Sequence, residues 1–211
     1  MAEMWIEVFQ EVSKLLHVNR ERLDRLDAAI GDGEHGSTMV KGIEQTLQDL
    51  EECQPETPAA VLAQAGASFA QAAGGAAGAL YASFFLAMAN IVRKDEHGAF
   101  STAILASMLG SGIGIIKKRG KAEVGDKTMI DTLVPALEAV KKGEKQNLPL
   151  SEVIPRTLAA AKAGMLSTIP MEPKRGRAGY LGERAVGHQD PGATSAYLIL
   201  KALHDVYMRR S

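Results

Sequence analysis

Three acidic side chains lie close together near the start of the chain. Residues 26–36 read Leu-Asp-Ala-Ala-Ile-Gly-Asp-Gly-Glu-His-Gly, which places Asp27, Asp32 and Glu34 within one short turn. Carboxylates this close repel one another unless a cation lies among them. Acidic oxygens on a glycine-hinged loop suit Mg²⁺, whose usual companion in proteins is a phosphate. Taken alone, the segment fits a metal site and a solvated acidic loop equally well.

The same segment also satisfies the dinucleotide-binding pattern G-x-G-x-x-G through Gly31, Gly33 and Gly36. That pattern indicates a dinucleotide site only when a strand precedes it and a helix follows it. Here residues 19–30 carry apolar side chains at helical spacing, and the carboxylates inside the pattern would repel a pyrophosphate. The sequence therefore argues against a Rossmann site.

A second glycine-rich segment, residues 74–78, reads Gly-Gly-Ala-Ala-Gly and opens an apolar helix that we expect over 79–92. Small residues at a helix N-terminus expose backbone N–H groups, which commonly bind anions. Close helix packing is the alternative reason for such residues, and the segment alone favours it.

Two further loops carry cations. Residues 119–129 read Arg-Gly-Lys-Ala-Glu-Val-Gly-Asp-Lys-Thr-Met, and residues 174–184 read Lys-Arg-Gly-Arg-Ala-Gly-Tyr-Leu-Gly-Glu-Arg. Arginine binds phosphate bidentately, and a methionine such as Met129 can pack on a flat base. The alternatives are helix capping, by charges around Asp126 and by Asp190 with Pro191, and a solvated surface loop.

Composition bounds the class of protein. The chain has 211 residues and a net charge of −1, so nothing favours nucleic acid or an anionic membrane as a partner. It has one cysteine, which excludes an internal disulfide and fits a reducing compartment. We find no signal peptide and no apolar run of spanning length without an interrupting Gly or charge. We therefore expect a soluble, cytoplasmic protein without a membrane partner.

The elements that must position these segments are helices. Apolar residues recur at helical spacing, and no alternation of period two is convincing. Aromatic residues make up only 5% of the chain, which also favours close-packed helices. We predict one all-α domain over residues 1–211, an up-and-down bundle of about eight antiparallel amphipathic helices. The expected helices cover residues 1–16, 19–30, 39–50, 57–73, 79–92, 101–118, 127–142, 151–168 and 192–209.

Taken in order, the four segments resemble the motifs of one family. They match Leu-Asp-x-x-Ile-Gly-Asp-Gly-x-His-Gly, Gly-Gly-Ala-x-Gly, Gly-Asp-Lys-Thr-Met-x-Asp and Gly-Arg-Ala-x-Tyr-Leu-Gly-Glu-Arg with a later Asp-Pro-Gly-Ala. This pattern resembles the nucleotide-binding L subunit of bacterial dihydroxyacetone kinase over essentially the whole chain. The resemblance implies a barrel of eight antiparallel helices that holds a magnesium nucleotide in the loops at one end.

The resemblance also assigns roles, with two Mg²⁺ ions and ADP or ATP as cofactors and metal-assisted transfer without an assigned catalytic side chain. Asp27, Asp32 and Glu34 occupy the positions of the metal ligands. The implied phosphate contacts are His35, Gly36, Ser37, Thr38, Ala76 and Ala77. The adenine would be flanked by Gly120 and Met129, and the nucleotide would be covered by Arg177, Asp190, Pro191 and Gly192.

Three positions depart from the family pattern. Glu34 stands where Asp is usual, Ala77 where Ser is usual, and Thr38 where Asn is common. The extra methylene of Glu34 moves its carboxylate, and Mg²⁺ tolerates poor octahedral geometry badly. These departures bear on nucleotide affinity and substrate choice.

In the family a separate K subunit holds the ketose, and the L chain passes it a phosphoryl group from the nucleotide. The separate chain, and His35 where fused ATP-dependent members often have Cys, favour recharging by a phosphocarrier M subunit. Alternatives are an ATP-dependent L subunit for another short ketose, a module for another partner-held substrate as in fatty acid kinase, and a non-catalytic nucleotide-sensing subunit. The sequence leaves open whether the chain forms a homodimer.

Overall fold

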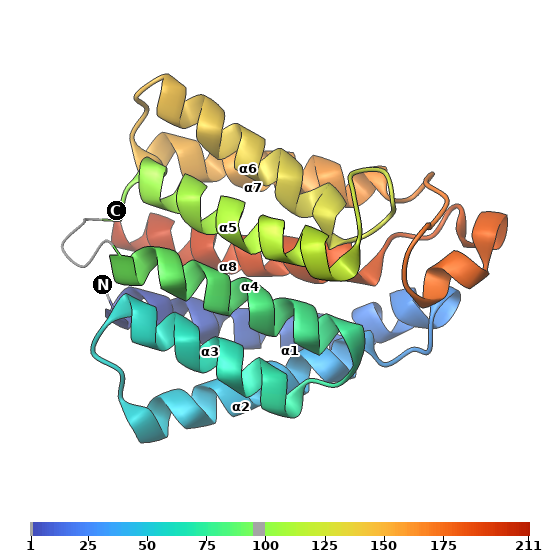
Figure 1. Cartoon of the computed structure of the whole chain (residues 1–211), viewed down its shortest axis with the longest axis horizontal. Coiled ribbons are helices and arrows are strands. Elements are labelled where there is room, and N and C mark those ends of the chain that lie inside the picture. The colour runs from blue at the N-terminus through green and yellow to red at the C-terminus, as the bar shows by residue number, and fades with distance from the viewer. Residues whose placement is uncertain (1, 95–99) are drawn as a thin grey trace.

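The computed structural model describes residues 2–94 and 100–211 (Figure 1). These residues contain no strand, which confirms the predicted all-α class. The α-helices are α1 (Ala2–Ile30), α2 (His35–Cys53), α3 (Pro58–Ala72), α4 (Gly75–Lys94), α5 (Thr102–Gly120), α6 (Met129–Lys145), α7 (Leu150–Ser167) and α8 (Pro191–Arg210). Two short 3₁₀ helices, η1 (Arg177–Tyr180) and η2 (Gly182–Ala185), lie between α7 and α8. The segments expected over 1–16 and 19–30 form one continuous helix, α1.

Helix starts follow side-chain chemistry. Thr57 caps α3 by accepting a hydrogen bond from the N–H of Ala60 at 3.2 Å, and Ser101 caps α5 in the same way. Helix α6 begins two residues later than expected, because Thr128 and Asp131 form a capping box at its start. Asp126, which the capping alternative invoked, instead accepts from the N–H of Glu123 at 2.9 Å.

The helices close into a ring. Each helix packs against the next one along the chain, and α8 packs against α1. Because the direction alternates, the connections α1–α2, α3–α4, α5–α6 and α7–α8 all lie at one end, while both termini lie at the other (Figure 1). The four segments that the sequence singled out are these connections, so the topology alone brings them together.

Close packing fixes the acidic turn. A Cβ atom at Gly36 would lie 2.2 Å from the carbonyl oxygen of Arg20, so only glycine lets the start of α2 approach α1 this closely. Deeper in the bundle, the ring of Phe85 contacts those of Phe9 and Phe69, with centroids 5.3 and 5.5 Å apart. The turn therefore joins two closely packed helices, and α1 is itself packed against the aromatic core.

Among the described residues, one helix, α4, is long and apolar enough to cross a membrane by length and composition alone. Its apolar window is 44% buried inside the structure. Tyr81, Phe84, Phe85 and Met88 face the core, as is usual for a bundle helix that buries one apolar face.

Candidate functional site

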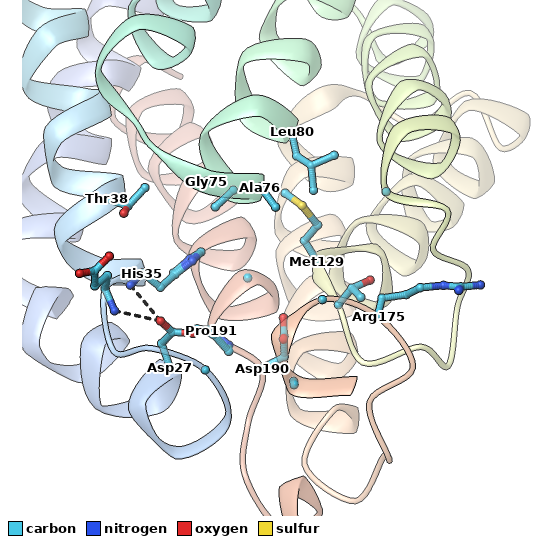
Figure 2. Close-up of a pocket in the computed structure, with 18 of the residues that line it drawn as sticks. Asp27, His35, Thr38, Gly75, Ala76, Leu80, Met129, Arg175, Asp190 and Pro191 are labelled. Carbon is cyan, nitrogen blue, oxygen red and sulfur yellow. Dashed lines mark hydrogen bonds between the residues drawn. The ribbon is translucent and has the colours of Figure 1, made fainter. Parts of the chain in front are cut away.

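A cavity of about 540 Å³ opens at the end of the bundle where the four connections meet. Its wall combines the α1–α2 turn, the start of α4, the connection after α5 and the segment before α8 (Figure 2). Most of the predicted site residues line it: Asp27, Asp32, Glu34, His35, Thr38, Ala76, Ala77, Gly120, Met129, Asp190, Pro191 and Gly192.

Two predicted phosphate contacts do not line the cavity. Gly36 packs against α1, and Ser37 is committed to Asp24 on the same helix. The backbone N–H of Ser37 donates to Asp24 Oδ1 at 3.0 Å, and its hydroxyl donates to Asp24 Oδ2 at 2.9 Å. Both donors of Ser37 join α2 to α1 in this structure, and its assignment as a phosphate contact stays a prediction.

Arg177 begins η1, and its side chain lies outside the described part of the structure. Its neighbours Arg175, Gly176 and Ala178 line the cavity. The arginine-rich segment therefore contributes to the site, while the assignment of Arg177 itself stays a prediction.

The acidic turn is organised by Asp27 at the end of α1. Its Oδ2 atom accepts from the backbone N–H groups of Glu34 at 2.9 Å and His35 at 3.2 Å, so it caps α2 (Figure 2). A Cβ at Gly31 would lie 2.3 Å from Asp27 Oδ1. The glycine thus leaves the second carboxylate oxygen uncovered on that side.

The donor chemistry of this turn fits Mg²⁺, because three carboxylates line one cavity and Asp27 keeps one oxygen outside the α2 cap. Asp32 and Glu34 are exposed. Within residues 2–94 and 100–211, no three His, Cys, Asp or Glu side chains are gathered into a formed metal centre. A metal role for Asp27, Asp32 and Glu34 stays a prediction.

A buried hydrogen-bonded chain lies on the inner side of the cavity. His35 Nε2 and Ser195 Oγ are 2.8 Å apart, and Ser195 Oγ lies 2.8 Å from the hydroxyl of Tyr81. Burial lowers the pKa of His35 to about 4, so the imidazole is neutral at pH 7, and burial raises the pKa of Tyr81. Sequence reasoning missed Ser195 and Tyr81, which lie on α8 and α4 and belong to none of the motifs.

Two further buried polar side chains, Lys127 and Asp190, lie near the start of α8. Asp190 caps α8 by accepting from the N–H of Ala193 at 2.6 Å, and burial raises its pKa to about 7. The side chain of Lys127 is 1% exposed, and burial lowers its pKa although the charge of Asp190 opposes the shift. Lys127 lies in the Gly-Asp-Lys-Thr-Met motif, but the sequence analysis considered its charge only together with the other cations of residues 119–129.

The helix starts around the cavity differ in their capping. Asp27 caps α2, Thr128 caps α6 and Asp190 caps α8. Positions 73–77 at the start of α4 are Ala-Gly-Gly-Ala-Ala, so no side chain there can accept a hydrogen bond from the first N–H groups of α4. This helix start is therefore the one best suited to an anion.

The opposite side of the cavity is apolar. Leu80 and the side chain of Met129 lie next to each other, away from Asp27 (Figure 2). The cavity therefore combines a place for a cation at the acidic turn, a place for an anion at α4, and an apolar wall for a flat ring. That order fits a metal-bound nucleotide.

Comparison with known proteins agrees with this geometry. The DAK2 domain model matches residues 29–205. The chain is 36% identical to the ADP-binding subunit DhaL of the PEP-dependent dihydroxyacetone kinase of Escherichia coli K12, over 87% of this chain and 86% of that protein. It is 37% identical to L-erythrulose 1-kinase of Mycolicibacterium smegmatis, over 94% of this chain and 34% of that protein.

A solved structure has the same fold. The crystal structure of the dihydroxyacetone kinase from C. freundii in complex with AMP-PNP and Mg²⁺ superposes with a TM-score of 0.70 at 29% identity. The match covers 97% of this chain and 33% of that longer chain. The chain therefore belongs to the DAK2 domain family, which includes the DhaL subunits of dihydroxyacetone kinases.

Proposed function

We propose that the chain acts as one nucleotide-binding domain, the ADP- or ATP-binding subunit of a multi-subunit kinase for dihydroxyacetone or a related short ketose. It would pass a phosphoryl group from bound nucleotide to a substrate held on a separate K subunit, in the cytoplasm. The observation that carries the proposal is the polarised cavity, with carboxylates, an uncapped helix start and an apolar wall in one continuous lining.

Each part of the nucleotide has a matching part of the wall. The phosphates would lie against the start of α4 at Ala76 and Ala77, because the first N–H groups of α4 lack a local side-chain acceptor. The base would pack against the wall formed by Leu80 and Met129, and the cations would bind Asp27, Asp32 and Glu34. Lys41 also lines the cavity and would supply positive charge toward the phosphates.

In this proposal the carboxylates and the helix start orient the terminal phosphate toward the open side of the cavity. Magnesium, when bound, supplies positive charge that offsets the charge of the phosphoryl group in transfer. His35 is half-buried and neutral at pH 7, so it helps to shape the wall and adds no charge. Ala77 offers a phosphate only its backbone N–H, because it has no hydroxyl.

A phosphocarrier M subunit is the proposed source of the phosphoryl group. The E. coli relative, which the chain matches over most of both lengths, is named PEP-dependent. The similarity to L-erythrulose 1-kinase keeps a four-carbon ketose as a second candidate substrate. Because the ketose would lie on the partner, the cavity of this chain does not discriminate between the two.

Reconstitution tests the proposal. The purified chain is mixed with Mg²⁺, ADP and a K subunit from the same genome, with either the PEP-driven phosphocarriers or ATP as donor, and each ketose is assayed for phosphorylation. Turnover that requires this chain and the phosphocarriers is the expected result. Turnover with ATP alone would overturn the donor assignment, and nucleotide binding without any turnover would indicate a sensing subunit.

A further inference from the structure

One wall of the cavity is formed by a long segment without α-helix. Residues 171–187, here termed the cover segment, lie between α7 and α8 and supply Arg175, Gly176 and Ala178 to the lining. The backbone N–H of Gly187 donates to the carbonyl of Ile169 at 2.8 Å, which closes the base of the segment. What holds the rest of the segment against the cavity therefore decides the shape of the site.

Asp126 holds the first part of the cover segment. Its carbonyl accepts from the N–H of Lys174 at 3.1 Å. Its carboxylate lies 3.6 Å from Lys174 Nζ and 3.3 Å from Arg175 Nε. The side chain of Asp126 is 8% exposed, whereas those of Lys174 and Arg175 are 64% and 48% exposed. The carboxylate thus forms a largely buried anchor for two cations at the surface.

Lys127, the next residue, holds both ends of the cover segment. Its Nζ donates to the carbonyl of Met171 at 3.0 Å and to the carbonyl of Ala185 at 2.7 Å. The backbone of Lys127 has a φ of +60°, which is costly for a residue with a side chain. That conformation accompanies a side chain that is directed inward, where its ammonium group ties together residues fourteen apart in the segment.

The two anchors are themselves fixed. They directly precede the capped start of α6, where the carboxylate of Asp131 accepts from the N–H groups of Gly125 at 2.6 Å and Thr128 at 2.8 Å. The flanking turn is therefore rigidly joined to α6, and the cover segment is attached to a part of the bundle that does not depend on a ligand.

We propose that Asp126 and Lys127 are positioning residues that hold the cover segment against the cavity and thereby slow the release of nucleotide. The release part rests on the proposed function, because it requires a nucleotide in the cavity. The holding part does not, and it can be measured in the nucleotide-free chain. Buried hydrogen bonds of a charged group contribute more than exposed ion pairs, so Lys127 has the larger effect.

Hydrogen exchange measured by mass spectrometry tests the holding part. In the nucleotide-free full chain, Lys127→Met should speed exchange across residues 171–187 about tenfold. Asp126→Asn, which retains an oxygen for the N–H of Glu123, should speed it about threefold. Exchange in α3 should not change. Lys201→Met, which removes a lysine paired with Asp205 on α8, is the control and should leave residues 171–187 unchanged. Unchanged exchange of the cover segment in both test variants would overturn the proposal.

Stopped-flow release of a fluorescent ADP analogue, with Mg²⁺ present, tests the consequence. Lys127→Met should raise the dissociation rate about tenfold and change the association rate less than about twofold, since the anchors act after binding. Should Lys127→Met fail to fold, Asp126→Asn decides, with a rise of about threefold. A loosened cover segment with an unchanged dissociation rate would overturn the release part. No binding to the native chain would instead refute the proposed function, while the exchange result would still decide the holding part.

Discussion

The two sides of the cavity are built in opposite ways. The acidic turn is local, since Asp27, Asp32 and Glu34 lie within eight residues, and Asp32 and Glu34 are exposed to solvent. The inner side is assembled from distant parts of the chain, and its polar groups are buried. His35 and Ser195, for example, come from α2 and α8 and are hydrogen-bonded at 2.8 Å.

This difference separates binding from stability. Exposed carboxylates are solvated without a ligand, so the turn can receive a cation without a large cost to the folded state. Buried polar groups must find partners within the protein, so they define the shape of the cavity and contribute to folding. Substitutions in the acidic turn, which is the outer side of the cavity, should therefore change nucleotide binding. Those on the inner side should mainly change the free energy of unfolding.

The largest expected effect is on the outer side. Asp32→Ala should weaken Mg²⁺-dependent ADP binding at least about a thousandfold, or about 4 kcal/mol, because it removes a proposed metal ligand. The free energy of unfolding should change by less than about 1 kcal/mol, because Asp32 is exposed. Calorimetry and urea unfolding measure the two quantities. Glu21→Ala, at an exposed carboxylate on α1, serves as control, and retained tight binding in Asp32→Ala would refute the metal assignment.

The second effect is a pH dependence of the free energy of unfolding, caused by Asp190 on the inner side of the cavity. The pKa of Asp190 rises from 3.8 to about 7 on folding, so the folded chain holds the proton more tightly than the unfolded chain. This contribution to stability is complete below the unfolded pKa of 3.8 and is lost as the pH rises toward about 7. The native chain should therefore lose a few kcal/mol across this range relative to Asp190→Asn, which can still cap α8.

Urea unfolding across this pH range measures the difference. Asp205→Asn, farther along α8, is the matched control, because ion pairs with Lys201 and His204 outweigh its partial burial and lower the pKa of that carboxyl. The free energy of unfolding of Asp205→Asn should change with pH as steeply as that of the native chain over this range. If the free energy of unfolding of Asp190→Asn changed with pH as steeply as that of the native chain, the titration could not be assigned to Asp190.

A smaller effect is expected at the boundary between the two sides. A methyl group at Gly31 would come within 2.3 Å of Asp27 Oδ1, so Gly31→Ala should turn that carboxylate and weaken ADP binding about tenfold. At Gly110 on α5 a methyl group would meet nothing within 4 Å, so Gly110→Ala is the matched control. Calorimetry should show weaker ADP binding in Gly31→Ala and unchanged binding in Gly110→Ala. Equal ADP affinities in the two variants would argue against Asp27 as a metal ligand.

The smallest effect on nucleotide binding is expected from the buried hydrogen-bonded chain. Ser195→Ala removes the partner of His35 Nε2 and of the Tyr81 hydroxyl, so it should lower the free energy of unfolding by about 1–2 kcal/mol. The affinity for ADP should change less than about threefold, because the hydroxyl supports the wall from behind. Denaturant unfolding and calorimetry test this, and a large loss of affinity without a loss of stability would place Ser195 in direct contact with the ligand.

The same contrast explains what the sequence predicted. Helix periodicity, the cap at Asp190 and the clustering of carboxylates are local properties, so they could be read from neighbouring residues. The partnership of His35 with Ser195 and Tyr81 depends on which helices pack together, which no local pattern specifies. The hydrogen bond between Ser37 and Asp24 on the preceding helix was missed for the same reason.

The central claim is that this cavity binds nucleotide through a cation at the acidic turn. Calorimetric titration of the nucleotide-stripped chain with ADP, once with Mg²⁺ and once with EDTA, tests it most directly. We expect saturable binding at one site per chain with Mg²⁺ and a loss of at least about a hundredfold in affinity with EDTA. Equal binding in both conditions would contradict the role of Asp27, Asp32 and Glu34, and no binding in either would contradict the nucleotide site itself.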